Sequence, residues 1–551
     1  MRARGRVAFA FAAVVAWTVG AAPAAAFTAP AFTVGALPKA VGVPYAPSVT
    51  RNEDVEPGMG IAGDGTIWVG SNIDVNSANE PRAAVALAGE DIWKSTDGGK
   101  TFQWVAAPFN VSSSNAGLGG EDSDLAVAPE KNAGGFYNVY ATSLYVAQSN
   151  VAISQDGGQT WTTMSIGSAG QLPAQDRPWL SADGPCTFYL TYHQLPFFSP
   201  VVNKYDVCNP ANIGVGIALN PVQSTSIFLN NTAPGLTNGF NKPFVDNSST
   251  SAKRHNVYVP MEACNLANPS DYINNVIGTA EQIPLCPPGV NTYVEVAAST
   301  DGGSTFNVYK VADNTNGEQQ VWPTSLGIDQ AGNVLVAWSD NHHSFFSKST
   351  DGGVTWTARK QVDPPAGTSV YPTIAGGAPG EVELSYYGTA VTGDSNDAAK
   401  MGTPGARAAA PWHLYWAKST DGGGTFNTVQ VTGVNHTGVL CTMGSACSAA
   451  GSRNLYDDFG LAISPTTGLG TIIFDADQPM TAPPGAAAVD PYTAYATEVA
   501  AAVTASPRPV VTGGGGGTPN TSTGDPSAPF LLVGMLLAAG LLLAGRRRAR
   551  G

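Results

Sequence analysis

The sequence has few charged side chains and few patterns with helical periodicity. Charged residues make up only 12 % of its 551 residues. The signatures of a nucleotide-binding P-loop, a serine-hydrolase nucleophile elbow and a zinc-peptidase helix are all absent. Cysteine pairs with the C-x-x-C spacing of zinc sites are also missing. These absences argue against the corresponding nucleotide-binding, hydrolase and zinc-binding classes.

Glycine and proline are abundant, at 64 and 40 residues respectively. Short apolar runs separated by Gly, Pro, Asn and Asp dominate the chain, and this pattern is typical of an all-β fold. A chain of this length can bury a large core.

One eight-residue phrase, Ser-x-Asp-Gly-Gly-x-Thr-aromatic, occurs five times, at residues 95–102, 154–161, 299–306, 349–356 and 419–426. A phrase repeated at this scale indicates one supersecondary unit used many times. Asp-Gly between β-prone runs predicts a hairpin turn, because Gly adopts positive φ and Asp bonds the nearby backbone. We therefore expect five self-capped turns with structural aspartates: Asp97, Asp156, Asp301, Asp351 and Asp421.

The phrase resembles the Asp-box (BNR) repeat of sialidases and related β-propellers. The resemblance implies a propeller over roughly residues 50–500. The same box also occurs in sortilin-type receptors, some glucanases and photosystem assembly factors, so it indicates a fold and not a reaction.

The catalytic motif of sialidases is not matched. That family clamps a carboxylate with three arginines, the first of which lies in a Phe/Tyr-Arg-Ile-Pro phrase. The corresponding phrase here is Val55-Glu56-Pro57, with Val55 in the arginine position. Asp91 falls near the family's acid/base aspartate.

Similar opening runs divide the chain into seven units, whose count favours seven four-stranded blades. Sialidases have six blades, so six is the alternative. In the third unit we expect strands at 187–192 and 213–219. The last unit lacks a fourth strand, and the run at 32–37 is expected to supply it and close the ring. The openings lie near Pro57, Asp122, Pro178, Pro243, Pro323, Pro372 and Asp458.

The two ends of the chain predict export and anchoring. Residues 1–26 read as a signal peptide, with three arginines before an apolar run and an Ala-rich cleavage site. The propeller occupies 27–505, and a Gly/Pro/Ser/Thr-rich flexible linker follows at 506–529. Residues 530–545 predict a membrane anchor and 546–551 a basic cytoplasmic tail, so the chain is expected at the cell surface.

The exported part is acidic. Seven of the 27 basic residues lie at the two ends, which leaves 20 basic against 41 acidic groups and a balance of −21. Such a field repels nucleic acid. Extracellular carbohydrate or glycoprotein is the expected partner, besides the membrane.

Six cysteines fit an oxidising compartment. Local pairing is favoured among the fifteen possible connectivities: Cys186 with Cys208, Cys264 with Cys286, and Cys441 with Cys447.

Residues just before the first strand of each blade gather at one mouth of a propeller's central channel, which is the default binding site. The carboxylates that could act in catalysis there are Asp176, Asp458, Glu121 and Asp122. The candidate binding residues are Arg51, Glu56, Arg177, Lys242, Tyr371, Arg453 and Tyr456. Ordinary capping and loop roles are the alternative for this set.

No cofactor is expected, although Glu121-Asp122-Ser123-Asp124 offers hard oxygen ligands suited to Ca²⁺ without EF-hand spacing. His342 and His343 are expected in a solvated loop. Aromatic rings such as Trp338, Trp412 and Trp416 are candidates to stack on sugars, with packing between blades as the favoured alternative.

Three functions remain open at this point. The first is a surface-anchored propeller that binds an extracellular glycan or protein. The second is a glycoside hydrolase that uses a carboxylate pair, Glu121 or Asp122 with Asp176 or Asp458. The third is a structural or adhesive surface protein.

Overall fold

The structure is a computed structural model. It describes residues 28–45, 47–73, 89–109, 121–145, 148–166, 175–194, 199–209, 212, 219–227, 237–264, 292–314, 324–363, 367–406, 408–442, 447, 451–455, 459–479 and 490–500. The expected signal peptide, linker, anchor and tail lie outside these residues. Among the described residues, no helix has the length and apolar character needed to cross a membrane.

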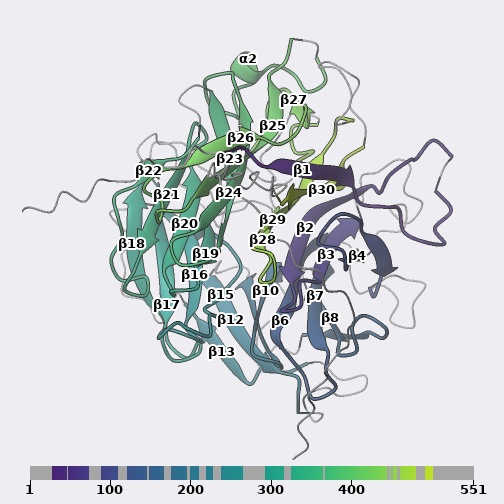
Figure 1. Ribbon diagram of the computed structural model, residues 1–551, viewed down its shortest axis with the longest axis vertical. Coiled ribbons are helices and arrows are strands. Elements are labelled where there is room, and N and C mark those ends of the chain that lie inside the picture. Colours follow the sequence, from purple (N-terminus) through teal and green to yellow (C-terminus); the bar gives the residue numbers. More distant parts are fainter. Residues whose placement is uncertain are drawn as a thin grey trace, which may run out of the picture. The chain divides into compact units, whose positions relative to one another are not determined.

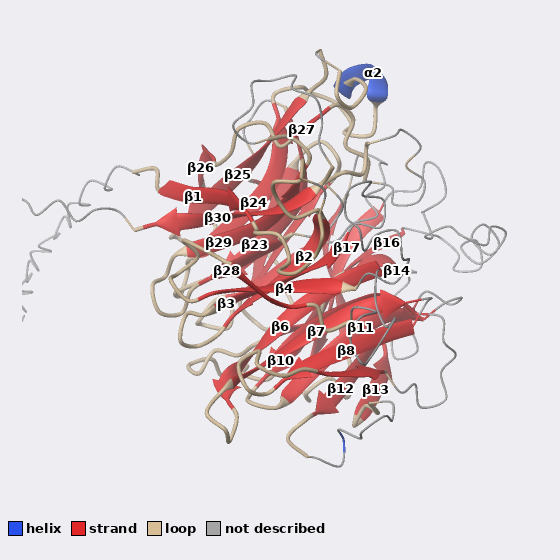
Figure 2. Ribbon diagram, turned by 90° about the vertical axis from the view of Figure 1, so that its right-hand side faces the viewer, coloured by secondary structure: helices blue, strands red, loops and turns tan. Residues whose placement is uncertain are grey.

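Seven antiparallel sheets follow one another along the chain, and the strands of successive sheets surround a common centre (Figure 1). The prediction of seven four-stranded blades is confirmed, and the six-blade alternative is wrong. Figure 2 shows that strands make up nearly all the regular structure, with the short helix α2 (Ala398–Met401) at one edge.

Blades 1 to 3 run from the inner to the outer strand in chain order. Blade 1 contains β2 (Asp54–Ile61), β3 (Ile67–Ile73), β4 (Glu90–Ser95) and β5 (Gln103–Ala106). Blade 2 contains β6 (Glu121–Lys131), β7 (Tyr137–Tyr145), β8 (Gln148–Ser154) and β9 (Thr162–Ser165). Blade 3 contains β10 (Gln175–Asp183), β11 (Thr187–Gln194), β12 (Ser199–Asp206) and β13 (Gln223–Ser226).

Blade 4 has a divided inner edge, since β14 (Thr237–Phe240) and β15 (Phe244–Val245) both pair with β16 (Val257–Cys264). It continues with β17 (Thr292–Ser299) and β18 (Asn307–Asp313). Blade 5 contains β19 (Ser325–Ile328), β20 (Val334–Ser339), β21 (Ser344–Ser349) and β22 (Lys360–Gln361). Blade 6 contains β23 (Thr368–Gly376), β24 (Val382–Thr389), β25 (Pro411–Ser419) and β26 (Asn427–Gln430), and β27 (His436–Thr437) pairs with β25.

Blade 7 combines the two ends of the described chain. Its strands are β28 (Gly460–Ile463), β29 (Gly470–Ala476) and β30 (Tyr492–Val499), and the outer strand is β1 (Ala31–Ala36). Figure 1 shows β1, in purple, beside β30, in yellow-green. The predicted closure of the ring by the N-terminal run is therefore confirmed.

Asn52 strengthens this closure. Its amide donates to the carbonyls of Leu37 (2.6 Å) and Thr493 (2.9 Å), and its Oδ1 accepts from the Thr493 amide (2.9 Å). The Asn52 side chain is completely buried. One residue thus holds the segment after β1, the start of blade 1 and β30 together.

The five Asp-boxes share one hydrogen-bond pattern. In the first, Ser95 donates to Asp97 Oδ1, and Thr101 donates its amide to Oδ1 (3.0 Å) and its hydroxyl to Oδ2 (2.6 Å). The other four boxes repeat these bonds. Each aspartate is thereby bound within its own turn.

The core lies between the blades, where aromatic side chains pack. Trp338, Trp412 and Trp416 are at most 1 % exposed, so these rings belong to the core and do not present a face to a sugar. In blade 3 the third strand is β12 (Ser199–Asp206), which was not expected; the expected run at 213–219 lies outside the described residues apart from residue 219.

Two of the expected disulfides are present, Cys186–Cys208 and Cys441–Cys447. The third expected pair involves Cys286, which lies outside the described residues.

Candidate functional site

A cavity of about 180 Å³ lies where the seven blades meet. Each blade contributes to its wall from its inner strand or from the residues just before that strand, so the cavity lies on the propeller axis. The lining residues are Pro57, Met59, Ser123, Asp124, Trp179, Asn241, Lys242, Phe244, Ser325, Thr373, Ile374, Phe459, Gly460 and Leu461.

The inner strands of blades 1, 3 and 6 share an unusual backbone feature beside the cavity, a left-handed residue directly before a proline. Glu56, Arg177 and Tyr371 have φ angles of 56°, 57° and 52°, and each directly precedes a proline. The strand register shifts at each of these positions. A left-handed residue before proline is strained, by about 1–3 kcal/mol. A bulge of this kind redirects the side chain, and blades 1, 3 and 6 all use it beside the axis.

An ion pair crosses part of the cavity wall between blades 2 and 4. Lys242 Nζ lies 3.1 Å from Asp124 Oδ1, and the other carboxylate oxygen accepts from the Leu180 amide at 2.8 Å. The Asp124 side chain is 3 % exposed and that of Lys242 is 26 % exposed. The lysine head is therefore the accessible member of the pair.

A second carboxyl group, Glu90, lies near Asp124. Glu90 is completely buried at the start of β4. Burial, and then the charges of Asp124 and Asp91, raise the pKa of Glu90 well above its usual range. Burial therefore disfavours the charged form of the Glu90 carboxyl group.

Two of the predicted catalytic carboxylates lie in direct contact. The carboxyl groups of Asp122 and Asp176, from blades 2 and 3, are hydrogen-bonded to each other. Burial and the neighbouring charge of Asp122 raise the pKa of Asp176 to about 7, although the adjacent Arg177 opposes the shift. The pair holds one proton between two carboxylates at mildly acidic pH.

The remaining predicted binding residues are partly engaged elsewhere. Arg51 stacks on the ring of Tyr492, with the guanidinium 4.4 Å from the ring centroid. Glu56 accepts from the Asn72 amide at 3.2 Å. Tyr371 donates its hydroxyl to the backbone carbonyl of Cys441 at 2.8 Å.

Arg177 is 1 % exposed, beside Asp176 and with its guanidinium 5.8 Å from the ring of Trp179. Arg453 lies on the partly buried turn at 451–455. Tyr456, Asp458 and the side chain of Glu121 lie outside what the structure describes.

The structure therefore brings Asp122, Asp176 and Arg177 together and places Lys242 in the cavity wall beside Asp124. Sequence reasoning missed Glu90, because a single glutamate at the first position of a strand carries no signal of a site. Asp91 is buried and accepts from the Trp104 indole at 2.8 Å, so it is engaged within blade 1.

The 246–256 loop of blade 4 contacts three other blades. Asn247 donates to the Ala182 carbonyl at 2.8 Å, and His255 lies 2.7 Å from Asp183, both in blade 3. Arg254 pairs with Glu130 of blade 2. Ser248 donates to the Gln330 carbonyl of blade 5 at 2.6 Å. These contacts tie four neighbouring blades together at the inner ends of their hairpins.

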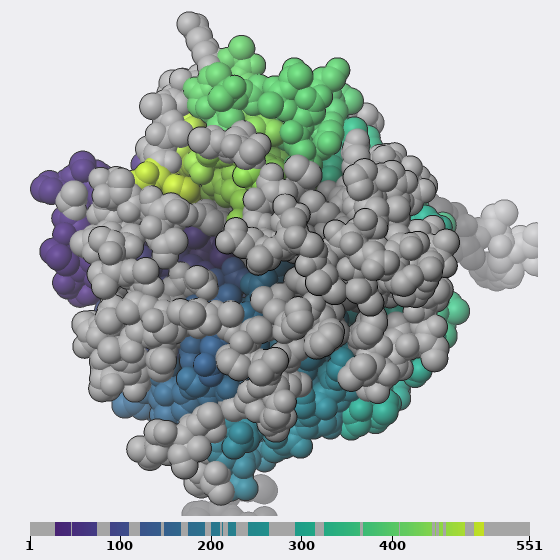
Figure 3. Space-filling view, turned by 180° about the vertical axis from the view of Figure 1, so that it is seen from behind, coloured from purple at the N-terminus to yellow at the C-terminus, as the bar shows by residue number. Residues whose placement is uncertain are grey.

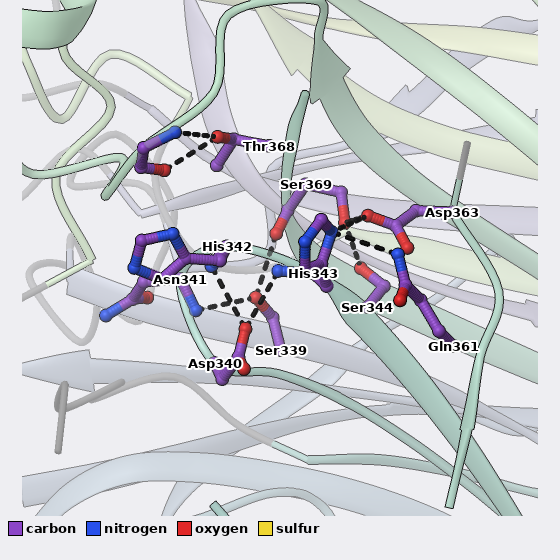
Figure 4. A network of polar contacts seen from close by, with 11 residues as sticks. Ser339, Asp340, Asn341, His342, His343, Ser344, Gln361, Asp363, Thr368 and Ser369 are labelled. Atoms are coloured by element: carbon purple, nitrogen blue, oxygen red, sulfur yellow. Dashed lines mark hydrogen bonds and ion pairs between the residues drawn. The ribbon is translucent and has the colours of Figure 1, made fainter. Parts of the chain in front are cut away.

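A separate polar network lies between blades 5 and 6 (Figure 4). His343 Nδ1 lies 2.8 Å from Asp363 Oδ2, which also accepts from the Ser369 hydroxyl at 3.0 Å. Asp340 accepts from the backbone amides of His342 and His343. Within the described residues, no group of three or more His, Cys, Asp and Glu side chains is arranged to hold a metal ion.

Figure 3 shows the propeller from behind, with the early blades in purple and blue below the green residues of blade 6.

No protein-family model matches this sequence, and no curated protein does.

Several solved structures are distantly similar to this chain. An arabinobiose complex of the GH93 α-L-arabinofuranosidase of Fusarium graminearum is 15 % identical, with a TM-score of 0.39, over 64 % of this chain and 92 % of the other. The NanB sialidase of Streptococcus pneumoniae is 10 % identical, with a TM-score of 0.36, over 71 % of this chain and 70 % of the other. A GH74 enzyme of Niastella koreensis is 15 % identical, with a TM-score of 0.39, over 78 % and 54 %. The pairing of its own strands shows that the chain is a seven-bladed propeller, and its similarity to these arabinanase and sialidase structures is low in both sequence identity and TM-score.

Proposed function

We propose that this protein is an exported propeller that binds carbohydrate in its axial cavity. The observation that carries the proposal is the composition of the cavity wall. Aromatic rings of Trp179, Phe244 and Phe459 lie beside hydroxyl, amide and charged groups. A sugar presents apolar C–H faces and a rim of hydroxyls, and this combination of surfaces suits both.

The size of the cavity limits the ligand. Sites for drug-sized molecules usually measure about 300–1,000 Å³. A volume of about 180 Å³ is smaller, and it suits one sugar unit with the rest of the glycan outside. Lys242 is the accessible charged group of the wall, so we assign it a direct contact with that unit.

Hydrolysis of a glycosidic bond is the second candidate, and one observation favours it. Asp176 retains a proton up to a pH of about 7, and a general acid needs such a pKa. The direct hydrogen bond between Asp122 and Asp176 leaves no room for a sugar or a water between them. These two groups therefore supply one acid together, and a second carboxylate elsewhere would have to act as base or nucleophile.

The proposed compartment is extracellular. Two disulfides fit an oxidising environment. Anchoring by residues 530–545 behind a flexible linker remains part of the proposal, as do the signal peptide and the basic tail.

The test uses the purified full chain on an array of immobilised glycans and on a panel of fluorogenic glycosides. We expect saturable glycan binding that weakens at least about tenfold in Lys242→Met, because a hydrogen bond to a charged group is lost. Lys310→Met is the matched control, since Lys310 forms an exposed pair with Asp313 outside the cavity. Turnover abolished by Asp176→Asn would support hydrolysis. Absence of all glycan binding would contradict the proposal and favour a structural or adhesive role.

A further inference from the structure

The charges that line the axial cavity cancel. Of the residues in its wall, only Asp124 and Lys242 carry charge, and they form an ion pair with each other. The remaining polar groups of the wall are neutral hydroxyls and amides: Ser123, Asn241, Ser325 and Thr373. The cavity therefore offers hydrogen bonds without a net charge.

Three further carboxyl groups, those of Glu90, Asp122 and Asp176, lie close to residues of the cavity wall. Glu90 lies close enough to Asp124 for their charges to interact. In blade 3, the cation Arg177 lies beside Asp176, which is itself bonded to Asp122. Lys242 in the wall and Arg177 beside Asp176 both already face carboxyl groups. Neither cation therefore offers an unopposed charge to a negatively charged ligand.

We propose that the axial cavity selects an uncharged, hydroxyl-bearing sugar unit and rejects carboxylated sugars such as sialic and uronic acids. This inference rests on the proposed carbohydrate binding at the same site. It specifies the chemical class of the ligand from the paired charges of the wall.

The chemistry of the pair explains the selection. A sugar hydroxyl both donates and accepts, so it can accept from the Lys242 ammonium and donate to Asp124 without separating them. A ligand carboxylate only accepts. It would have to draw Lys242 away from Asp124, which is 3 % exposed and would be left as a buried charge without its cation.

The experiment compares neutral and carboxylated glycans on the intact protein. The neutral probes are arabino-, galacto- and gluco-oligosaccharides, and the charged probes are sialylated and glucuronylated versions of the same chains. We expect wild-type binding to the neutral set only, with a Kd that changes less than about twofold between about 50 and 500 mM NaCl, because no net charge is neutralised.

The decisive variant is Asp124→Asn, which leaves Lys242 as an unpaired cation in the wall. We expect it to gain affinity for the carboxylated probes by about tenfold or more, with a salt-dependent Kd. Asp313→Asn is the matched control, because it removes a carboxylate from an exposed lysine pair and should leave both preferences unchanged.

The outcomes separate the two proposals. Binding of carboxylated sugars by the wild type, equal to or tighter than binding of neutral sugars, overturns the selectivity while leaving carbohydrate binding intact. Absence of binding to any probe overturns both. If Asp124→Asn unfolds, as judged by its thermal transition, the wild-type preference and its salt dependence still decide the question.

Discussion

Replacing Asp176 by asparagine should stabilise the protein at neutral and alkaline pH. The pKa of Asp176 rises from 3.8 to about 7 in the folded state because the group is buried beside Asp122. The folded protein therefore holds this proton more tightly than the unfolded chain. The contribution to stability is fully present below pH 3.8 and is lost as the pH rises through about 7.

The magnitude follows from the difference between the two pKa values. Each pH unit corresponds to about 1.4 kcal/mol, so the stability lost to this carboxyl group is on the order of 4 kcal/mol above about pH 7. The introduced asparagine would have no carboxyl proton to lose, and its amide can donate to Asp122. The stability advantage of Asp176→Asn over the wild type should therefore grow by about 3 kcal/mol between about pH 5 and pH 8.

Urea unfolding followed by tryptophan fluorescence measures this difference at both pH values. Asp313→Asn is the control, since it makes the same chemical change at a side chain that is 56 % exposed. The control should stay within about 0.5 kcal/mol of the wild type at both pH values. An Asp176→Asn advantage that is absent, or that does not change with pH, would refute the shared-proton interpretation of the Asp122–Asp176 pair.

Three further predictions concern the scaffold. Asn52→Ala should lower the free energy of unfolding in urea by about 3 kcal/mol, because it leaves backbone groups of Leu37 and Thr493 buried without partners. An unchanged urea midpoint would contradict the role of Asn52 in ring closure. Burial alone would lower the pKa of His436, but the charge of Asp477 and hydrogen bonds to Asp477 and the Val439 carbonyl raise it. The ion pair between His436 and Asp477 should therefore stabilise the fold fully below about pH 6.5 and lose this effect as the pH rises through the folded pKa of His436. Asp477→Asn should lower the free energy of unfolding by about 3–5 kcal/mol at about pH 6, and by less at about pH 9, as measured by urea unfolding. The Thr425 amide and then the Ser419 hydroxyl lower the pKa of Asp421 to about 2, so its contribution is present above pH 3.8 and lost as the pH falls toward 2; Asp421→Ala should lower the thermal midpoint at about pH 7 but not at about pH 2.

The repeated turns made the architecture predictable from sequence. Each box marks the turn between the last two strands of a blade. The run at 32–37 has no partner strand nearby in the chain, and it was therefore expected to pair with the last blade and close the ring. The strand β12 (Ser199–Asp206) of blade 3 was not expected from the sequence, because the blade lacks a box and β12 has a proline at its second position and several polar residues. Without the turn signal, its apolar content alone did not mark it as a strand.

The proximity of Asp122 and Asp176 was predictable from the sequence, but their chemistry was not. The spacing of the blade openings predicts that the two groups lie close together, yet the sequence does not show whether they face each other across a gap or bond directly. That depends on the left-handed bulge at Arg177, which redirects the strand after Asp176. The burial of Glu90 near Asp124 is likewise a result of packing between blades 1 and 2.

The pairing of β1 with β30 also constrains how the molecule can assemble. Residues 31–36 are synthesised before the rest of the ring, yet Ala31 meets its partner Val499 only after the last blade exists. Six blades can therefore form while the chain is still growing, but the seventh must wait for the complete polypeptide. Until β1 of the same chain pairs with it, β30 has an open edge that the β1 strand of another copy can occupy. Slow pairing of β1 with β30 would therefore favour strand-swapped dimers over monomers.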